Sequence, residues 1–333
     1  MAKVVAFFNH KGGVGKTTIL FNVAIALAQV GKKVVLFDAD SQANLTALAV
    51  TEAHYQKALD DEITIWSALE PLVTGAGDFK PMEPLMLRSN LWLVPGDIRL
   101  ADFEGICPTG WTEALAGEAR GFRVTTALYR LFHETANRKN ADFVLVDLGP
   151  NVNALNRSAL IASDGFIIPL AADLFSVRAL PSVGNSIAGW VRQWRTALSN
   201  KPKTVTFALP SCESAPIPLG YVSQQFSVFS GSLTEAFQRW QDKIPYAYQE
   251  GVIRPLKAAD LPVDEQGISP LIALKYLSAL VPKAQQAHKA IFELSGAEAR
   301  GAHFKRSKDT RDTFLKLAEI IIEVLGSPHD YLP

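Results

Sequence analysis

The stretch FFNHKGGVGKTT, residues 7–18, decides the fold of this 333-residue chain. It follows an apolar run, residues 3–8, that is typical of a β-strand, and it leads into residues 16–31, where apolar side chains recur at helical spacing. Glycines between a strand and a helix let backbone N–H groups surround phosphate oxygens, and the helix amino terminus adds a positive dipole. The stretch therefore predicts a phosphate-binding loop.

The polar residues of this loop suit a nucleoside triphosphate. Lys16 is placed to reach the β- and γ-phosphates, and the Thr17 hydroxyl to bind Mg²⁺. The common pattern G-x-x-x-x-G-K-[ST] requires a glycine at position 10, where this chain has His10. A second lysine, Lys11, stands in the same tight loop, and the repulsion between the two lysines has to be offset by anions.

Strand and helix patterns alternate along the first half of the chain. Further apolar strand patterns that end in polar or turn residues cover residues 32–40, 90–97, 142–150 and 163–173. Fully apolar strands that alternate with helices predict an α/β fold, a doubly wound and mostly parallel sheet with helices on both faces. Because ligands bind beyond the carboxyl ends of such strands, Asp38, Asp40 and Asp147 are expected to converge on the glycine loop.

The second half is less regular. We predict further strands in residues 204–211, 218–228 and 270–277, and a final amphipathic helix over residues 307–326. Residues 104–121 and 229–267 are interpreted as irregular insertions in one domain that spans residues 1–333. No internal repeat suggests a different architecture.

Composition narrows the classes of function. Lys plus Arg and Asp plus Glu both number 33, so a globally basic nucleic-acid protein is not indicated and any polyanion site must be a local patch. The two cysteines, Cys107 and Cys212, exclude a disulfide framework and a Cys-rich metal motif within the chain. With no signal-peptide pattern and no apolar run long enough for a membrane span, we expect a cytoplasmic protein.

Three motifs resemble those of the ParA/MinD family of ATPases, which are P-loop NTPases. KGGVGKT, residues 11–17, resembles the family's deviant P-loop, with Lys11 at the signature-lysine position. DADSQANLT, residues 38–46, is similar to its D-x-D-x-Q-x-N-x-T segment, and DFVLVDLGP, residues 142–150, to its Walker B strand. This chain departs from the family at Gly149, where relatives more often have proline, and the departure is expected to loosen the loop that follows.

The resemblance implies ATP and Mg²⁺ as cofactors and assigns the site residues one by one. Asp40 would orient or activate the attacking water, with Lys11 and Lys16 completing the catalytic set, and the adenine ring would lie near residues 223–225. Lys11 would reach the phosphates bound by a second subunit, so that two subunits enclose two nucleotides. The implied Mg²⁺ site comprises Thr17, Asp38 and Asp147, and the implied nucleotide contacts are Lys11, Gly12, Gly13, Val14, Gly15, Lys16, Thr17 and Thr18.

The implied activity is that of a homodimerising ATPase, slow until a partner stimulates it, that positions or partitions a cargo. Non-specific DNA is the expected track and the nucleoid the expected location, because the carboxyl-terminal part is locally basic. The residues expected to contact DNA are Lys305, Arg306, Lys308 and Arg311. The alternative is a nucleotide-gated switch that acts on a partner protein without DNA, as in a multi-protein defence or secretion system. Residues 229–267 are the candidate surface for an unidentified activating or cargo protein, or else a lid.

Other members of the nucleotide fold fit less well. The chain ends in LGSPHDYLP, without the basic amphipathic helix of membrane-targeted relatives, so no membrane insertion is expected. Cys107 and Cys212 do not lie beside the matched motifs, which disfavours a reductase with a shared iron–sulfur cluster. A glutaminase-type Cys–His signature is not evident in the sequence, which disfavours an amide-transferring synthetase.

Overall fold

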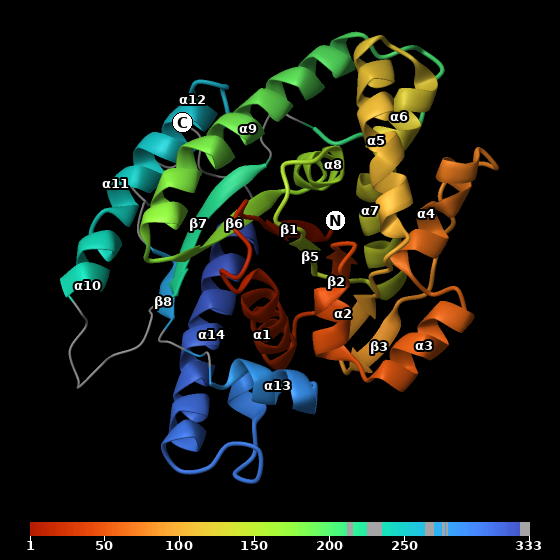
Figure 1. The fold of residues 1–333 in the computed structure, drawn as a ribbon. Helices are drawn as coiled ribbons and strands as arrows, with labels where there is room; N and C mark the ends of the chain where they lie inside the picture. The colour runs from red at the N-terminus through yellow and green to blue at the C-terminus, as the bar shows by residue number, and fades with distance from the viewer. Residues whose placement is uncertain (212–215, 225–234, 264–269, 275–276, 278, 327–333) are drawn as a thin grey trace.

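An eight-stranded sheet forms the centre of the molecule (Figure 1). The computed structural model describes residues 1–211, 216–224, 235–263, 270–274, 277 and 279–326. Within them the strand order is β3-β4-β2-β5-β1-β6-β7-β8, with β3 antiparallel to β4 and every other neighbouring pair parallel. The predicted doubly wound α/β fold is therefore confirmed.

Short apolar segments make up the strands, and β2, β5 and β6 are buried along their whole length, while β1 is buried at all but its first residue. The strands are β1 (Lys3–Phe7), β2 (Val34–Ala39), β3 (Leu85–Arg88), β4 (Leu91–Val94), β5 (Phe143–Leu148), β6 (Gly165–Ala171), β7 (Ile217–Gln224) and β8 (Ile272–Leu274). The antiparallel edge strand β3 is an element that the sequence patterns did not predict, because it has only four residues and none of them is fully buried.

Helices connect the strands and cover both faces of the sheet. In the first half they are α1 (Lys16–Gln29), α2 (Asn44–Ala49), α3 (Glu52–Asp60), α4 (Ile65–Thr74), α5 (Leu100–Leu115), α6 (Ala119–Thr125) and α7 (Ala127–Lys139). In the second half they are α8 (Ala154–Ile161), α9 (Leu174–Ser199), α10 (Glu235–Gln241), α11 (Ile244–Tyr248), the π-helix η1 (Gln249–Ile253), α12 (Arg254–Lys257), α13 (Val281–Ala287), the 3₁₀-helix η2 (Ile291–Glu293) and α14 (Ala302–Gly326).

Two hydrophobic cores lie on the two faces of the sheet. Helices α1, α2, α13 and α14 pack on one face, and α4 to α9 with the α11–α12 segment pack on the other (Figure 1). Side chains alternate between these cores along each strand, so that Val4 and Ala6 face the α4–α9 side while Val5 and Phe7 face the α1 side. Asp38 and Asp147 follow the same alternation, which turns both carboxylates toward α1.

The prediction of an irregular insertion at residues 104–121 is wrong. Residues 104–121 are not irregular, because they form most of α5 and the first turn of α6. Their glycines permit close packing instead of breaking the helices. A Cβ on Gly121 would lie 2.2 Å from the Ala114 nitrogen, and one on Gly110 would lie 2.7 Å from a Val124 methyl carbon. Gly110 and Gly121 therefore mark a tight α5–α6 contact and not a loop.

The predicted strand at residues 204–211 is also wrong. This segment contains no strand, and it runs past α9, where the Trp194 Nε1–H donates to the Pro210 carbonyl at 3.0 Å. The sheet position beside β6 belongs to β7, within the predicted 218–228 segment.

Residues 225–228 of that segment lie outside the described residues, as do 229–234 and 264–267 of the second insertion, whose described remainder is largely helical. β8 forms within 270–277, and α14 confirms the helix predicted over 307–326.

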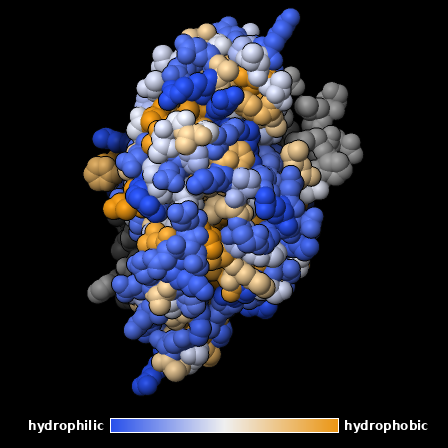
Figure 2. All heavy atoms as spheres, turned by 90° about the vertical axis from the view of Figure 1, so that its right-hand side faces the viewer, coloured by the Kyte–Doolittle hydropathy of each residue, from blue (hydrophilic) through white to orange (hydrophobic). Residues whose placement is uncertain are grey.

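One face of the molecule is mostly polar (Figure 2). On the side of the molecule that lies to the right in Figure 1, hydrophobic side chains form small separate groups among hydrophilic ones (Figure 2). Among the described helices, none is both long enough and apolar enough to cross a membrane.

Candidate nucleotide-binding site

The loop between β1 and α1 has the backbone shape that its glycines predict. We call residues 10–17 the P-loop. Gly13 and Gly15 have φ of 74° and 75°, in the left-handed region that favours glycine, and Gly15 is the N-cap of α1. A Cβ on Gly15 would lie 1.8 Å from the Gln224 side-chain nitrogen, so the end of β7 rests directly on the P-loop. The adenine region suspected at residues 223–225 thus adjoins the P-loop through Gln224, while Gln225 lies outside the described residues.

Lys16, Thr17 and Asp147 meet beneath the P-loop. Thr17 Oγ1 donates to Asp147 Oδ2 at 2.7 Å. Lys16 is only 8% exposed, and burial lowers its pKa, although Asp147 and Asp40 oppose that effect. Burial, with a further contribution from Asp38, raises the pKa of Asp147. A lysine and a carboxylate taken this far out of water are typical of a site that binds charged ligands.

Asp38 stands beside Asp147, because β2 and β5 pair in register at these two residues. Burial raises the pKa of Asp38 to about 7, while two hydrogen bonds from Thr46 oppose the rise. The Thr46 backbone N–H and Oγ1–H donate to Asp38 Oδ2 at 2.8 and 2.7 Å, and Thr46 Oγ1 accepts from the Gly96 N–H at 2.8 Å. Thr46 is a positioning residue. It belongs to the segment at residues 38–46, but the sequence pattern assigned it no role.

Asp40 lies on the other side of the site, facing the loop after β5. The Gln42 N–H donates to Asp40 Oδ1 at 3.0 Å, and a Cβ on Gly149 would lie 3.3 Å from that same oxygen. The 149–153 loop is tied by an amide, since Asn156 Nδ2 donates to the carbonyls of Gly149 and Asn151 at 2.9 and 2.6 Å. Asn156 thus anchors the loop at Gly149 and Asn151.

The second lysine of the P-loop has a partner within the chain. Lys11 forms an ion pair and hydrogen bond with Asp173, the N-cap of α9, and its ammonium lies 5.8 Å from the centre of the Phe175 ring. Burial raises the pKa of Asp173, but Lys11 and the Ser176 N–H more than offset it, so the pKa is lowered. Part of the expected lysine repulsion is therefore offset without any nucleotide. Asp173 carries the signal that identified Asp38, a carboxylate at the end of an apolar strand.

His10 occupies the position of the missing P-loop glycine. Burial, together with the charge of Lys16, lowers its pKa, which favours the neutral imidazole. Its ring packs edge-on against Phe8 with centroids 5.2 Å apart. His10 therefore turns toward the α4–α9 core and leaves the phosphate side of the loop to the backbone.

These residues fit a divalent cation. Asp147 Oδ1 is buried and has no hydrogen-bond partner among the described residues, while Thr17 Oγ1 contacts the other carboxylate oxygen. A hydroxyl and two adjacent carboxylates are hard oxygen ligands of the kind that Mg²⁺ prefers, and a nucleotide phosphate would add further ones. The structure brings Thr17, Asp38 and Asp147 together, and it places Asp40 across from Asp147 beside Gly149.

The four basic residues expected to contact DNA lie far from the P-loop in sequence and are all exposed on the first half of α14. Asp309 and Asp312 are exposed among them, on the same side of the helix as Lys305 and Lys308. Arg311 reaches Gln29 of α1, and the Lys308 ammonium donates to the Phe292 carbonyl at 2.9 Å. The cluster is thus accessible, but its charges are mixed.

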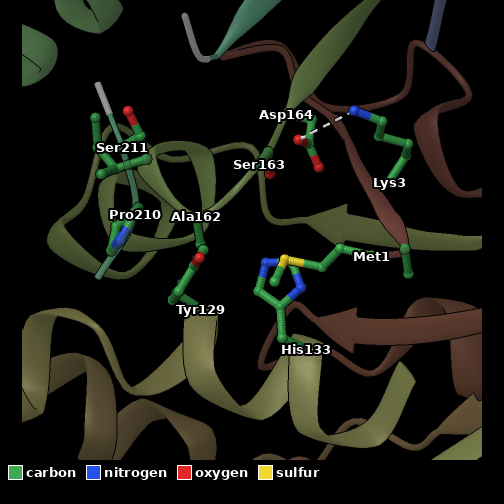
Figure 3. A pocket seen from close by; sticks show the side chains of 11 residues that line it. Met1, Lys3, Tyr129, His133, Ala162, Ser163, Asp164, Pro210 and Ser211 are labelled. Atoms are coloured by element: carbon green, nitrogen blue, oxygen red, sulfur yellow. Dashed lines mark ion pairs between the residues drawn. The ribbon is translucent and has the colours of Figure 1, made fainter. Parts of the chain in front are cut away.

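A separate cavity of about 210 Å³ lies at the opposite, amino-terminal edge of the sheet (Figure 3). Figure 3 shows Tyr129 and His133 from α7 facing Asp164, which precedes β6. The Val4 N–H donates to Asp164 Oδ2 at 2.7 Å, and Lys3 lies 4.0 Å from the other oxygen. Asp164 therefore already serves the start of β1, and this cavity is not part of the phosphate site.

Several known proteins are similar in sequence to the part of the chain that contains the site. A protein-family model described as an AAA domain matches residues 2–199. The Bacillus subtilis protein Soj, a sporulation initiation inhibitor, is 29% identical over 188 residues, which cover 56% of this chain and 65% of Soj. The Caulobacter vibrioides chromosome partitioning protein ParA is 32% identical over 190 residues, covering 56% of this chain and 62% of ParA. The chain thus matches less than two thirds of the length of these relatives.

Solved structures show the same fold over most of the chain. A Corynebacterium diphtheriae protein superposes with a TM-score of 0.68 at 22% identity, covering 86% of this chain and 97% of the other. Cyanothece McdA, in its ATP complex, superposes with a TM-score of 0.59 at 18% identity, covering 99% of both chains. At these identities the likeness concerns the fold alone.

Proposed function

Because the chain belongs to the ParA/MinD family of P-loop ATPases, we propose that it binds ATP with Mg²⁺ and dimerises around the nucleotide. Hydrolysis would reset the dimer, which positions or partitions a cargo. Relatives named for chromosome partitioning, and the fold shared with McdA in its ATP complex, support this proposal. The protein would be cytoplasmic.

The observation that carries the ATPase proposal is the group formed by Lys16, Thr17 and Asp147. A buried lysine with a lowered pKa is costly in the free protein, and so is a buried carboxylate oxygen that has no partner within the described part of the chain. Triphosphate oxygens would neutralise Lys16, and Mg²⁺ held by Thr17 and Asp147 would satisfy that oxygen. When bound, Mg²⁺ supplies charge neutralisation on the phosphate oxygens. Asp40, on the open side of the site, would place the attacking water.

Lys11 supports the dimer. In the single chain its charge is held by Asp173, at the edge of the site and about one third exposed. A triphosphate bound to a second subunit carries more negative charge than one carboxylate and would compete for Lys11. Phe175 beside this pair and Val152 after β5 are 72% and 52% exposed, and apolar side chains at this edge suit burial against a second copy.

A matched set of variants tests these roles. Lys16→Ala should abolish ATP binding. Asp40→Ala should bind ATP and accumulate as a dimer, whereas Lys11→Ala should bind nucleotide and stay monomeric. Equilibrium binding of a fluorescent ATP analogue measures nucleotide binding, size-exclusion chromatography with light scattering measures dimerisation with ATP and with ADP, and phosphate release measures turnover. Full turnover by Asp40→Ala, or a stable ATP dimer of Lys11→Ala, would contradict the assigned roles.

The Lys11–Asp173 pair can be tested alone. Asparagine caps a helix as well as aspartate does, so Asp173→Asn keeps the start of α9 and removes only the charge. We expect this variant to dimerise at a lower ATP concentration than the parent, because Lys11 is already released. An unchanged ATP dependence would show that the pair does not restrain Lys11.

For the target of the dimer, non-specific DNA is our first proposal and a partner protein our second. The exposed basic residues of α14 favour DNA, whereas the interleaved Asp309 and Asp312 favour a protein. We would measure binding of Asp40→Ala to a random duplex across a salt series. Arg306→Gln should lower the salt slope by about 1, while Lys57→Gln on α3 should not. No binding by a confirmed ATP dimer would leave the partner protein.

A further inference from the structure

A second cavity, of about 370 Å³, lies beside β7 on the face opposite to α1. Helices α10 and α11 lie beside α9, on the side of the molecule that carries β7 and β8 (Figure 1). The cavity takes its wall from the carboxyl end of β7 and from the α10–α11 junction. Its main lining residues are Tyr221, Ser223, Gln238, Gln241, Asp242 and Pro245. Apart from Ser223, which lies in the region suspected for the adenine ring, none of them belongs to the nucleotide site described above.

The floor of this cavity contains hydrogen-bonding groups that are not used. Ser223 is 1% exposed, yet its Oγ has no partner among the described residues, and Gln241 Oε1 is buried without one as well. Buried polar atoms in proteins are normally paired, so two unpaired atoms that line one cavity indicate a ligand that forms hydrogen bonds. The Ser223 hydroxyl can donate or accept, whereas the Gln241 oxygen only accepts, so it requires a ligand with a donor. Tyr221, 2% exposed, presents an aromatic wall and is fixed by Tyr248, whose ring centre lies 5.1 Å away.

The charge of the lining decides which donors fit. Asp242 is exposed at the mouth, where Gln238 Nε2 donates to one of its oxygens at 2.8 Å and leaves the other available. None of the described lining residues is a lysine or arginine. The nearby Lys243 ammonium lies over the Trp240 ring, 4.6 Å from its centre. A phosphate or carboxylate would therefore meet an unpaired carboxylate, whereas a cation would be attracted.

We propose that this cavity binds a guanidinium group, through Ser223, Gln241 and Asp242 with Tyr221 against its flat face. A guanidinium presents five N–H donors in one plane and stacks on aromatic rings, whereas an ammonium is compact and strongly hydrated. The volume lies at the lower end of small-ligand sites and accommodates an arginine side chain with its backbone atoms. The source is either a free arginine-like compound or an arginine of a partner protein.

A ligand in this cavity would lie close to the P-loop. Ser223 and Gln224 are neighbours in β7 and point to opposite faces of the sheet, Ser223 into the cavity and Gln224 onto Gly15. A guanidinium bound to Ser223 therefore lies one residue from a side chain that touches the P-loop.

The test uses the full chain without nucleotide, so its outcome does not depend on ATPase activity. Calorimetry would compare N-acetyl-arginine amide with N-acetyl-citrulline amide, which has the same shape but a neutral urea. We expect the arginine compound to bind and the citrulline compound to bind at least tenfold more weakly. Free arginine and agmatine distinguish the sources, since a site for a partner's side chain should prefer the capped amide.

Variants complete the test. Asp242→Asn should weaken arginine-amide binding about threefold to fivefold, as expected for an exposed charge pair, and Gln241→Leu about tenfold. Asp61→Asn, an equally exposed change after α3, should have no effect. Asp242 is on the surface, so its variant is expected to fold. Absence of binding, equal binding of the two amides, or unchanged affinity in both cavity variants would each overturn the proposal.

Discussion

Thr46→Val tests how the structure holds Asp38 inside the site. Valine has the shape of threonine without the hydroxyl, and Thr46 and Asp38 are both 0% exposed, so the change removes hydrogen bonds and little else. Two bonds are lost, the one donated to Asp38 Oδ2 at 2.7 Å and the one accepted from the Gly96 N–H at 2.8 Å. The backbone N–H of residue 46 still donates to Asp38, so the carboxyl group keeps one partner.

The expected loss of stability depends on pH. The pKa of Asp38, about 7, lies above its ordinary value of 3.8, so the folded protein holds this proton longer and its stability falls as the pH rises from about 4 to about 7. Removing the Thr46 donor raises this pKa further, so the decline continues to higher pH in the variant. Above pH 7 we expect a loss of roughly 3–5 kcal/mol, from a charge-assisted bond and an unpaired N–H. At about pH 5, where the carboxyl is protonated, the loss should be roughly 2–3 kcal/mol.

Urea unfolding at about pH 5 and about pH 8.5 measures both values. Thr46→Ser is the control, because it keeps the hydroxyl and removes one methyl group, at a cost of about 1 kcal/mol with no pH dependence. The reasoning is refuted if the valine and serine variants lose the same stability at both pH values, or if the loss in the valine variant shrinks as the pH rises.

Two glycine predictions have matched controls within the same elements. Gly15→Ala should lower stability by about 1–2 kcal/mol, since φ is 75° there, whereas Gly12→Ala, with open space around it, should not change the melting temperature. Gly184→Ala should cost about 1–3 kcal/mol, because its Cβ would lie 2.0 Å from the Gly251 carbonyl oxygen and push α9 from the π-helix. Gly189→Ala in the same helix meets no atom within 4 Å and should stabilise by about 0.5–1 kcal/mol. Equal melting temperatures within either pair would contradict these packing contacts.

The nucleotide-binding site could be predicted from the sequence because the patterns that indicate it are local. A glycine loop between a strand and a helix has few backbone solutions, and a carboxylate at the end of a parallel strand must lie at the same edge of the sheet as its neighbours. These rules placed Lys16, Thr17, Asp38 and Asp147 together without knowledge of the strand order. They could not show that Asp38 and Asp147 pair directly, since that depends on β2 lying next to β5.

Glycine and proline misled the prediction where contacts between elements decide their meaning. Residues 104–121 carry loop-forming residue types, yet Gly110 and Gly121 serve a close approach of α5 to α6. The 204–211 segment has the composition of a strand, but β7 occupies the only open position beside β6. The type of a residue limits which conformations are possible at its position, and the elements packed against it decide which of them the chain adopts.

By itself the sequence determined the fold class, the P-loop and the carboxylates that face it, because each depends on residues close together in the chain. Only the tertiary structure decided what holds those groups. Asp173 reaches Lys11 from 162 residues away, and Gln224 rests on Gly15 from the end of β7, two strands away from β1 in the sheet. Hydrogen bonds and ion pairs act over a few ångströms, so partners this distant in sequence are defined only once the strands are ordered and the helices packed.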